Sequence, residues 1–284
     1  MWPAPSPLGE GTPGDPGLYG PGSAVWTIGR ERVLLAGGQT ALLMQVAHPL
    51  IAAGVVAHSD FHADPFARLR ATLDAMLTIA FGDVSQARAA AAGVAAVHAR
   101  VRGRLPAPAG PFPAGTPYRA TDPSLSLWVH ATLVHTSIEA YARFVRRPPP
   151  SLFERYYQET KRQTPLFGIP DRLLPVSYRD FLDYVREVVE GPDLTVSDDA
   201  RSLAASVLHP PLPAVLRPAA AAARVIAAGL LPAPLRERFG LRWGPAERAE
   251  FVSSSAAVRT ARRLLPRSAR EWPHAAVAAR RVRG

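Results

Sequence analysis

Four of the eight histidines in this chain lie in one segment, residues 40–104. They are His48, His58, His62 and His98, and the residues between them are mostly apolar and small, as in TALLMQVAHPLIAAGVV and AAAAGVAAVHARVRG. An imidazole can ligate a metal, transfer a proton or donate a hydrogen bond. Because burying a polar ring among apolar residues is costly, this pattern indicates a buried cofactor or metal site rather than a solvated face.

His98 is the strongest candidate for a cofactor ligand. The two helical turns before it contain only Ala, Gly and Val, which leaves room for a flat, bulky group. A lone histidine on an apolar face is often a core residue satisfied by a hydrogen bond, and spacing alone leaves that alternative open. Haem needs one protein imidazole, an apolar pocket and a cation for its propionates. Arg102, expected one turn after His98 on the same helical face, is the candidate cation.

A second pair of candidate residues precedes this histidine in the sequence. Arg68 and Thr72 are four residues apart, so a helix would place them on one face. They could present a cation and a hydroxyl to the opposite side of a haem. We therefore predict Arg68 and Thr72 as catalytic and cofactor-binding residues, His98 as the metal ligand, and Arg102 as a further cofactor-binding residue.

Several other kinds of catalytic centre are excluded by residue type or spacing. The chain has no cysteine, which excludes a disulfide, a thiolate nucleophile, an iron–sulfur cluster and thiolate-ligated haem. The sequence has no HExxH zinc motif, and it has one Glu-x-x-His motif, from Glu271 to His274, where a di-iron bundle needs two. It also lacks a glycine-rich phosphate loop and a G-x-S-x-G motif.

The other histidines have structural interpretations. His48 precedes a proline at a helix junction, and His58 is placed at a helix end, so both are expected to cap or to form hydrogen bonds. His130 is expected to brace the core through a buried hydrogen bond. His209 and His274, which lie among prolines or in the tail, are expected to be solvated.

The formal net charge of +10 raises the question of a nucleic-acid partner. However, 32 of the 33 basic residues are arginine, they are spread along the chain, and proline and alanine are abundant, which indicates a GC-rich coding sequence. We therefore expect no nucleic-acid partner. Residues 259–283 are an exception, with eight arginines. This segment is either a solvated tail or a peripheral contact with an anionic surface or membrane.

Helix signals cover the chain and strand signals are scarce. Asp64-Pro65 and Asp122-Pro123 have the form of helix starts, and Ser177 is expected to begin another helix with Asp180 in its first turn. The predicted helices lie near 25–36, 39–47, 50–58, 64–81, 83–103, 122–145, 151–167, 177–190, 197–208, 213–229 and 245–265. The sequence predicts an all-α fold, with a single globin-like multi-helix domain over residues 23–265.

The two ends of the chain differ from this domain in composition. Residues 1–22 are rich in Pro and Gly and lack the basic start and apolar stretch of a signal peptide, so we expect a flexible leader and a cytoplasmic protein. Residues 266–284 form an Arg-rich tail. The apolar run from Val33 to Ala57 is long enough for a membrane span, but polar residues and His48 interrupt it, so a buried helix pair is the better interpretation.

The order of the motifs resembles the catalytic domain shared by mpaB-type oxygenases and the latex-clearing rubber oxygenase. The family order is AHP, HS, DP, R-x-x-x-T, VH-x-x-V-x-G, Y-x-A-x-DP and WVHAT. In this chain the corresponding residues are Ala47-His48-Pro49, His58-Ser59, Asp64-Pro65, Arg68 to Thr72, Val97-His98, Val101, Gly103, Tyr118, Ala120, Asp122-Pro123 and Trp128-Val129-His130-Ala131-Thr132. Each motif is short, but their order and spacing together are specific, and the resemblance covers residues 25–240.

This resemblance implies a globin-like helical fold around haem b and oxidative chemistry on apolar substrates. It implies that His98 is the proximal iron ligand and that Arg68 and Thr72 belong to the distal pattern R-x-x-K-T. Ala71 stands where that pattern has lysine. In the family the lysine can close the distal iron position, so its loss implies an open position here and argues against rubber cleavage.

The sequence therefore favours a haem b-dependent oxidoreductase that uses O2 or peroxide on a small apolar substrate, terpenoid or aromatic. A second enzymatic function keeps the haem but performs oxidative coupling or dehydrogenation in secondary metabolism. Two functions without catalysis also fit the sequence. One is that of a haem-binding protein, and the other is that of an all-α interaction protein that binds acidic partners through its Arg-rich tail.

Overall fold

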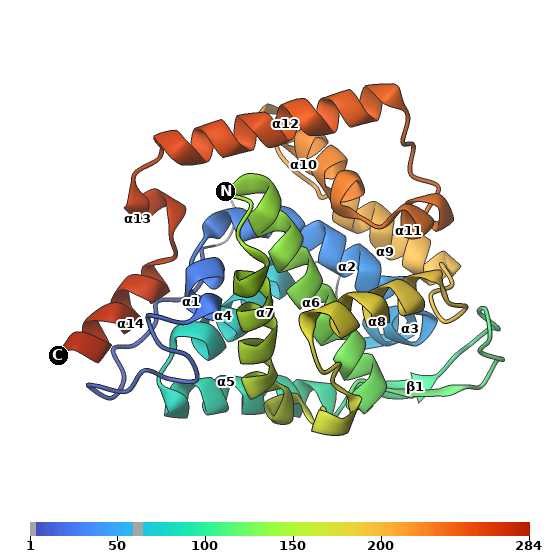
Figure 1. Ribbon diagram of the computed structural model, residues 1–284. Coiled ribbons are helices and arrows are strands. Elements are labelled where there is room, and N and C mark those ends of the chain that lie inside the picture. The colour runs from blue at the N-terminus through green and yellow to red at the C-terminus, as the bar shows by residue number, and fades with distance from the viewer. Residues whose placement is uncertain (1–3, 59–64) are drawn as a thin grey trace.

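The computed structural model describes residues 4–58 and 65–284, with the backbone alone described for residues 65–68. This part of the chain folds into helices joined by short connections, with one pair of short strands (Figure 1). The α-helices are α1 (Ala24–Gly29), α2 (Gly38–Val46), α3 (Pro49–His58), α4 (Pro65–Phe81), α5 (Val84–His98), α6 (Pro123–Phe144), α7 (Pro150–Thr160), α8 (Tyr178–Glu190), α9 (Asp198–Leu208), α10 (Arg217–Leu230), α11 (Ala233–Arg238), α12 (Pro245–Leu264), α13 (Arg267–Arg270) and α14 (Pro273–Arg283). The 3-10 helices are η1 (Arg32–Gly37), η2 (Lys161–Phe167), η3 (Asp171–Leu173) and η4 (Ala214–Leu216).

The prediction of an all-α fold is confirmed, and so are several predicted helix ends. Asp122 caps α6 by accepting a hydrogen bond from the Ser124 amide at 2.8 Å, with proline in the first turn. Ser177 and Asp180 form a reciprocal capping box at the start of α8. Asp64 lies outside the described residues. A globin-like arrangement of the helices around a haem stays a prediction.

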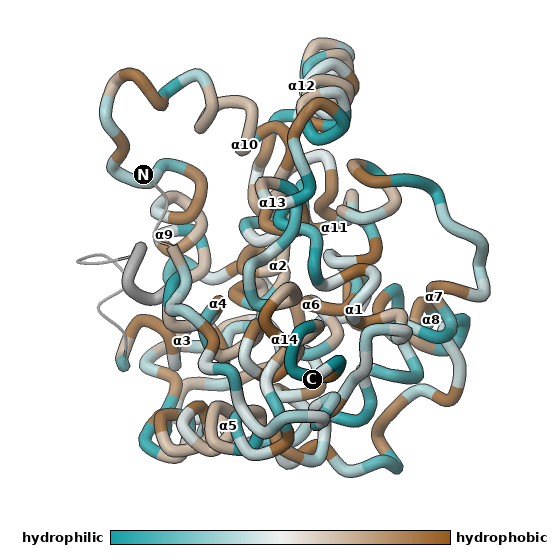
Figure 2. The backbone as a smooth tube through the Cα atoms, turned by 90° about the vertical axis from the view of Figure 1, so that its left-hand side faces the viewer, coloured by the Kyte–Doolittle hydropathy of each residue, from teal (hydrophilic) through white to brown (hydrophobic). Residues whose placement is uncertain are grey.

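The centre of the molecule is α6, which runs through the middle of the view in Figure 1. Twelve of its 22 residues are buried, on several faces, because α2, α7, α10 and α12 surround it. The indole Nε1 of Trp128 donates a hydrogen bond to the Met44 carbonyl at 3.0 Å, which joins α6 to α2. In Figure 2, α2 and α6 lie near the middle of the view and α12 lies at its upper edge.

The apolar run from Val33 to Ala57 forms η1, α2 and α3, which fits the predicted set of core helices. The axes turn by 105° between the 32–46 and 49–58 segments. Within the described ranges, no single helix has both the length and the apolar composition to cross a bilayer, and this bent pair meets those criteria only when its two parts are combined.

The N-terminal and C-terminal segments pack together on the surface of the helical body. Tyr19 is 1% exposed, and the Gly14 amide donates a hydrogen bond to the Arg281 carbonyl at 2.8 Å. His274 and Arg281 on α14 are buried, and the ring Nε2 of His274 lies 2.9 Å from the Ser6 carbonyl oxygen. The expectation of a solvated His274 was therefore wrong. The flexible leader over residues 1–22 stays a prediction. The boundaries of the domain, at 22/23 and 265/266, stay predictions.

The second difference from the prediction lies after α5. The sequence predicted a helix as far as residue 103, but α5 ends at His98 and residues 102–104 form β1 (Arg102–Arg104), which pairs antiparallel with β2 (Pro117–Arg119). Gly103 lies opposite Tyr118, whose ring covers it, so that a Cβ at residue 103 would lie 2.5 Å from the Tyr118 hydroxyl oxygen. Pairing with a strand 13 residues away thus overrides the local helix propensity.

Candidate functional site

The predicted site residues lie on an antiparallel helical hairpin formed by α4 and α5. Only Gly82 and Asp83 separate the two helices, which pack along each other. A Cβ at Gly82 would lie 2.5 Å from the Thr78 carbonyl oxygen, so the tight turn requires glycine. Asp83 then caps α5 by accepting a hydrogen bond from the Gln86 amide at 2.7 Å, and this bond lowers the pKa of the Asp83 carboxyl group.

In this hairpin, Arg68 and His98 lie at matching positions along the axes of the two helices. Arg68 lies 13 residues before the end of α4, and His98 lies 14 residues after the start of α5. Because each residue advances a helix by about 1.5 Å, the two backbone positions lie at similar distances from the turn. Thr72 lies on α4, one helical turn nearer to the bend. The fold therefore places the predicted proximal and distal residues on neighbouring helices; the side chain of Arg68 lies outside the described part.

His98 lies on the inward face of α5. It continues a stripe at helical spacing that begins with the buried residues Ala87 and Ala91 and passes through the half-buried Val94. The His98 side chain is itself half-buried, and both His98 and Thr72 interact with other parts of the protein. An imidazole at the end of an apolar, small-residue stripe has the surroundings expected for a ligand to a group lying against this helix.

The end of α3 contacts the segment that follows His98. His58, the last residue of α3, lies with its Nε2 3.1 Å from the Arg102 carbonyl oxygen, and the backbone amide of Val101 donates to the His98 carbonyl at 3.0 Å. This contact fulfils the predicted hydrogen-bonding role of His58 and ties α3 to the segment that follows His98. His62 lies outside the described residues.

Arg102 does not lie where the sequence placed it. Because α5 ends at His98, Arg102 is a strand residue, directly opposite Arg119, and both side chains are exposed. The prediction that it follows His98 by one turn on the same helical face was wrong. The exposed side chains of Arg102, Arg104 and Arg119 share one face of the two-stranded ribbon, while Tyr118 on the other face is buried.

A metal ion held by side chains alone would need several ligands close together. In the described ranges, no group of three or more His, Asp or Glu residues is arranged to hold a metal ion. A haem iron needs only one protein imidazole. Near the site, Val56 on α3, Ala71 on α4 and Val97 on α5 are exposed, with Val56 at 42% and Val97 at 52%.

Two other histidines are deeply buried. His48 is 7% exposed, and its Nδ1 accepts a hydrogen bond from the Leu50 amide at 3.3 Å, as predicted for a residue at a helix junction. His130 is also 7% exposed, but its Nε2 has no hydrogen-bond partner among the described residues, so the predicted bracing bond is not found at that atom. Burial lowers the pKa of each ring to about 4, which keeps both neutral at neutral pH.

One further histidine, half-buried, had been assigned no role from the sequence. His135 lines a cavity of about 210 Å³ between α6, α8 and the start of α11, together with Leu182, Val185 and Pro232. Burial lowers its pKa to about 4 as well. The tertiary arrangement places His135 beside residues of α8 and the start of α11. His209 is exposed, as predicted.

Comparison of the sequence with known proteins identifies the family of this chain. The family described as "ER-bound oxygenase mpaB/B'/Rubber oxygenase, catalytic domain" matches residues 25–267. Two mycobacterial relatives, "Uncharacterized protein Mb2261" of Mycobacterium bovis and "Uncharacterized protein Rv2237" of Mycobacterium tuberculosis, are each 26% identical to this chain over 235 residues, 80% of this chain and 88% of the relative. No solved structure matches the chain significantly. The chain belongs to the family of mpaB and rubber oxygenase catalytic domains.

Proposed function

We propose that this chain is a haem b-dependent oxygenase that acts on a small apolar substrate, with His98 as the iron ligand. The observation that carries the proposal is the α4–α5 hairpin, which brings the positions of Arg68 and His98 to one level and turns His98 inward. Family membership supports an oxygenase-type reaction. The half-buried imidazole and its small apolar neighbours support haem as the cofactor.

Each residue has a distinct role in this proposal. When bound, the haem supplies the redox chemistry with O2 or peroxide. His98 holds the group through one imidazole nitrogen, and the other nitrogen donates a hydrogen bond that fixes the ring orientation. Arg68 and Thr72 supply a cation and a hydroxyl that orient the oxidant and substrate by hydrogen bonds. Arg102, from the strand that follows His98, pairs with a propionate.

Apolar side chains near these helices support the proposed substrate class. The exposed apolar side chains of Val56, Ala71 and Val97 support a small terpenoid or aromatic substrate. Since an alanine stands at residue 71 in place of the family's lysine, no lysine from this position would close the distal side of a bound haem, and rubber cleavage is not proposed. Oxidative coupling or dehydrogenation on the same substrate class is the second candidate reaction.

The decisive experiment is the ultraviolet–visible spectrum of the protein produced with a haem precursor, compared with His98→Ala. We expect a Soret band in the wild type that collapses or shifts in the variant. His209→Ala, at an exposed histidine far along the chain, is the matched control and should keep the wild-type spectrum. A colourless wild-type protein that also fails to take up haemin would refute the proposed cofactor.

Product analysis then separates the reaction types. With an apolar substrate and isotopically labelled O2, an oxygenase incorporates label into the product. Coupling and dehydrogenation yield an oxidised product without label. A protein that binds haem through His98 but gives no product with any oxidant is instead a haem-binding module.

A further inference from the structure

The C-terminal end of α12 forms an exposed corner with unusual composition. We define the α12 corner as Arg259, Arg263, Leu264, Leu265 and Arg267, where the chain leaves α12 and turns into α13. Figure 1 shows this turn at the upper left, and in Figure 2 α12 lies at the upper edge of the molecule. Within α12 itself only Ser255 is buried, so the helix lies on the outside of the fold.

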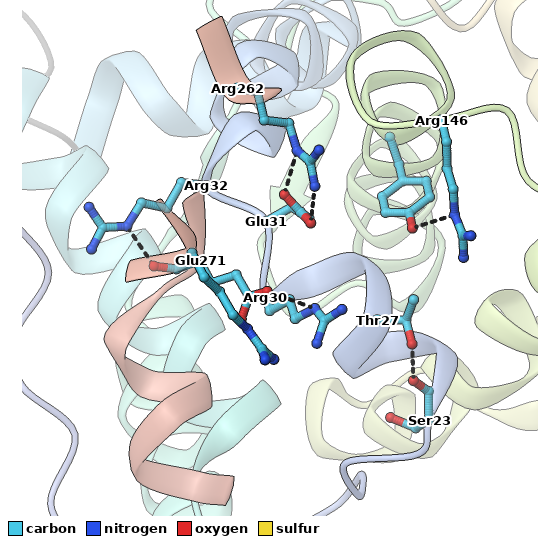
Figure 3. A network of polar contacts seen from close by, with 10 residues as sticks. Ser23, Thr27, Arg30, Glu31, Arg32, Arg146, Arg262 and Glu271 are labelled. Atoms are coloured by element: carbon cyan, nitrogen blue, oxygen red, sulfur yellow. Dashed lines mark hydrogen bonds and ion pairs between the residues drawn. The ribbon is translucent and has the colours of Figure 1, made fainter. Parts of the chain in front are cut away.

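The rotation of α12 about its axis is fixed by an ion pair. Arg262 points inward, where its guanidinium binds the buried carboxylate of Glu31 (Figure 3). Because successive helical residues are rotated by about 100°, Leu264 then faces almost directly away from the protein. It is 81% exposed, and the adjoining Leu265 is 47% exposed. The contact on the opposite face thus holds Leu264 in solvent, and Leu265 is the extended residue that follows the helix.

The charge around these leucines has one sign. Arg259, Arg263 and Arg267 are all exposed, and residues 259–267 include no acidic residue. Among the ion pairs of the described residues, only Arg267 of these three takes part, with Glu271 at 2.9 Å. The α12 corner therefore combines exposed large apolar side chains with a surplus of positive charge.

We propose that the α12 corner docks onto an anionic lipid bilayer. Leucines that project from a convex helix end can enter the boundary between headgroups and acyl chains, while arginines beside them bind lipid phosphates. A helix end at the edge of the molecule suits a planar partner. The positive charge complements the negative surface potential of anionic membranes. This inference does not depend on the identity of the cofactor.

Sedimentation of the full-length protein with vesicles tests the proposal. The probes are vesicles of phosphatidylcholine alone and of phosphatidylcholine mixed with phosphatidylglycerol. We expect binding to the anionic vesicles only. Arg259→Gln/Arg263→Gln should weaken that binding about tenfold or more, since each arginine near an anionic surface contributes on the order of a fivefold change in partitioning. Leu264→Ser/Leu265→Ser should also weaken binding, and these exposed positions should leave the melting temperature unchanged.

Matched controls separate a specific corner from the general effect of a net charge of +10. Arg88→Gln/Arg179→Gln removes the same charge from exposed positions elsewhere, and Val176→Ser/Val215→Ser removes side chains that are 80% and 81% exposed. Controls that bind like the wild type, beside corner variants that do not, support the proposal. Equal loss in both sets, or no binding to anionic vesicles, overturns it.

Discussion

Arg262 and Glu31 form a two-pronged ion pair between residues that are 231 positions apart in the sequence (Figure 3). The Nε of Arg262 donates to one Glu31 oxygen at 2.8 Å, and a terminal guanidinium nitrogen donates to the other. The side chains are 15% and 4% exposed, respectively. Close by, the Trp272 amide donates to the Arg30 carbonyl at 2.9 Å. The C-terminal part of the chain is thereby fastened to the segment that precedes the core helices.

Loss of Glu31 should destabilise the fold strongly. Glu31→Ala leaves the largely buried Arg262 guanidinium without its anion, and breaking such a pair from one side costs about 3–5 kcal/mol. We expect this decrease in the free energy of unfolding, measured by urea denaturation at neutral pH. Because the pair directs α12, the variant should also become more susceptible to proteolysis in the C-terminal helices.

Two further variants serve as controls for Glu31→Ala. Asp183→Ala breaks the exposed pair of Asp183 with Arg186, whose side chains are 42% and 60% exposed, and should change stability by less than about 1 kcal/mol. The double variant Glu31→Leu/Arg262→Met should recover much of the loss, since no charge is then left buried. A Glu31→Ala protein as stable as the wild type would show that the pair contributes nothing.

The same substitution at two glycines should have opposite effects. Gly103→Ala places a Cβ 2.5 Å from the hydroxyl oxygen of the buried Tyr118, so the ring must move and we expect a loss of about 1–3 kcal/mol. Gly93→Ala lies within α5, where a Cβ meets no atom within 4 Å, and should stabilise by about 0.5–1 kcal/mol through helix propensity. Thermal unfolding of the two variants checks the contrast; destabilisation by Gly93→Ala would contradict it.

Buried neutral histidines should make the protein less stable in acid. The folded-state pKa of His130 is lowered to about 4 by burial, against about 6.5 in the unfolded chain. Below pH 6.5 the unfolded state binds a proton that the folded state does not, so stability present above pH 6.5 is lost as the pH falls towards 4. The slope contributed by one such histidine reaches about 1.4 kcal/mol per pH unit.

His130→Leu removes a histidine that is protonated in the unfolded state but not in the folded state between about pH 4 and pH 6.5. The free energy of unfolding should therefore fall less steeply between pH 6 and 4.5 than in the wild type, while the variant keeps the apolar volume of the site. Urea denaturation across this pH range measures the slope, with His209→Leu as the control for loss of a surface imidazole. An unchanged slope in His130→Leu would mean that the folded and unfolded states protonate this ring alike.

Sequence reasoning succeeded where structure depends on near neighbours. The start of α6 at Asp122-Pro123 and the start of α8 at Ser177 are set by bonds within three residues of each cap. It failed where a distant segment decides. Ala, Val and Arg favour helix through residue 103, but β2 ends α5 at His98 by pairing with β1. His274 is buried because Ser6, 268 residues away, contacts its ring.

In the candidate site too, features set by neighbouring residues were predicted and a feature set by a distant segment was not. Helical spacing placed Arg68 and Thr72 on one helix, and the predicted helices 64–81 and 83–103 left only a short turn before the helix that carries His98. The displacement of Arg102 to a strand was not visible, because a two-stranded ribbon of three residues on each strand has too short an alternating pattern.

Ala71→Lys tests the proposed distal side directly. Ala71 is exposed on α4, next to Thr72, so a lysine is tolerated there and its helix propensity differs little from alanine. If haem binds as proposed, the introduced amine should compete for the distal iron position. We expect a shifted absorption spectrum in the haem-loaded variant and weaker binding of added imidazole than in the wild type.

Ala71→Leu provides the control, since it adds a side chain of intermediate length without an amine. It should change imidazole affinity far less than Ala71→Lys does. Haem uptake is measured first in all three proteins, so that failure to bind haem is distinguished from a wrong assignment of the distal side. Equal imidazole affinity in haem-loaded wild type and Ala71→Lys would place residue 71 away from the iron and remove Arg68 and Thr72 from their proposed roles.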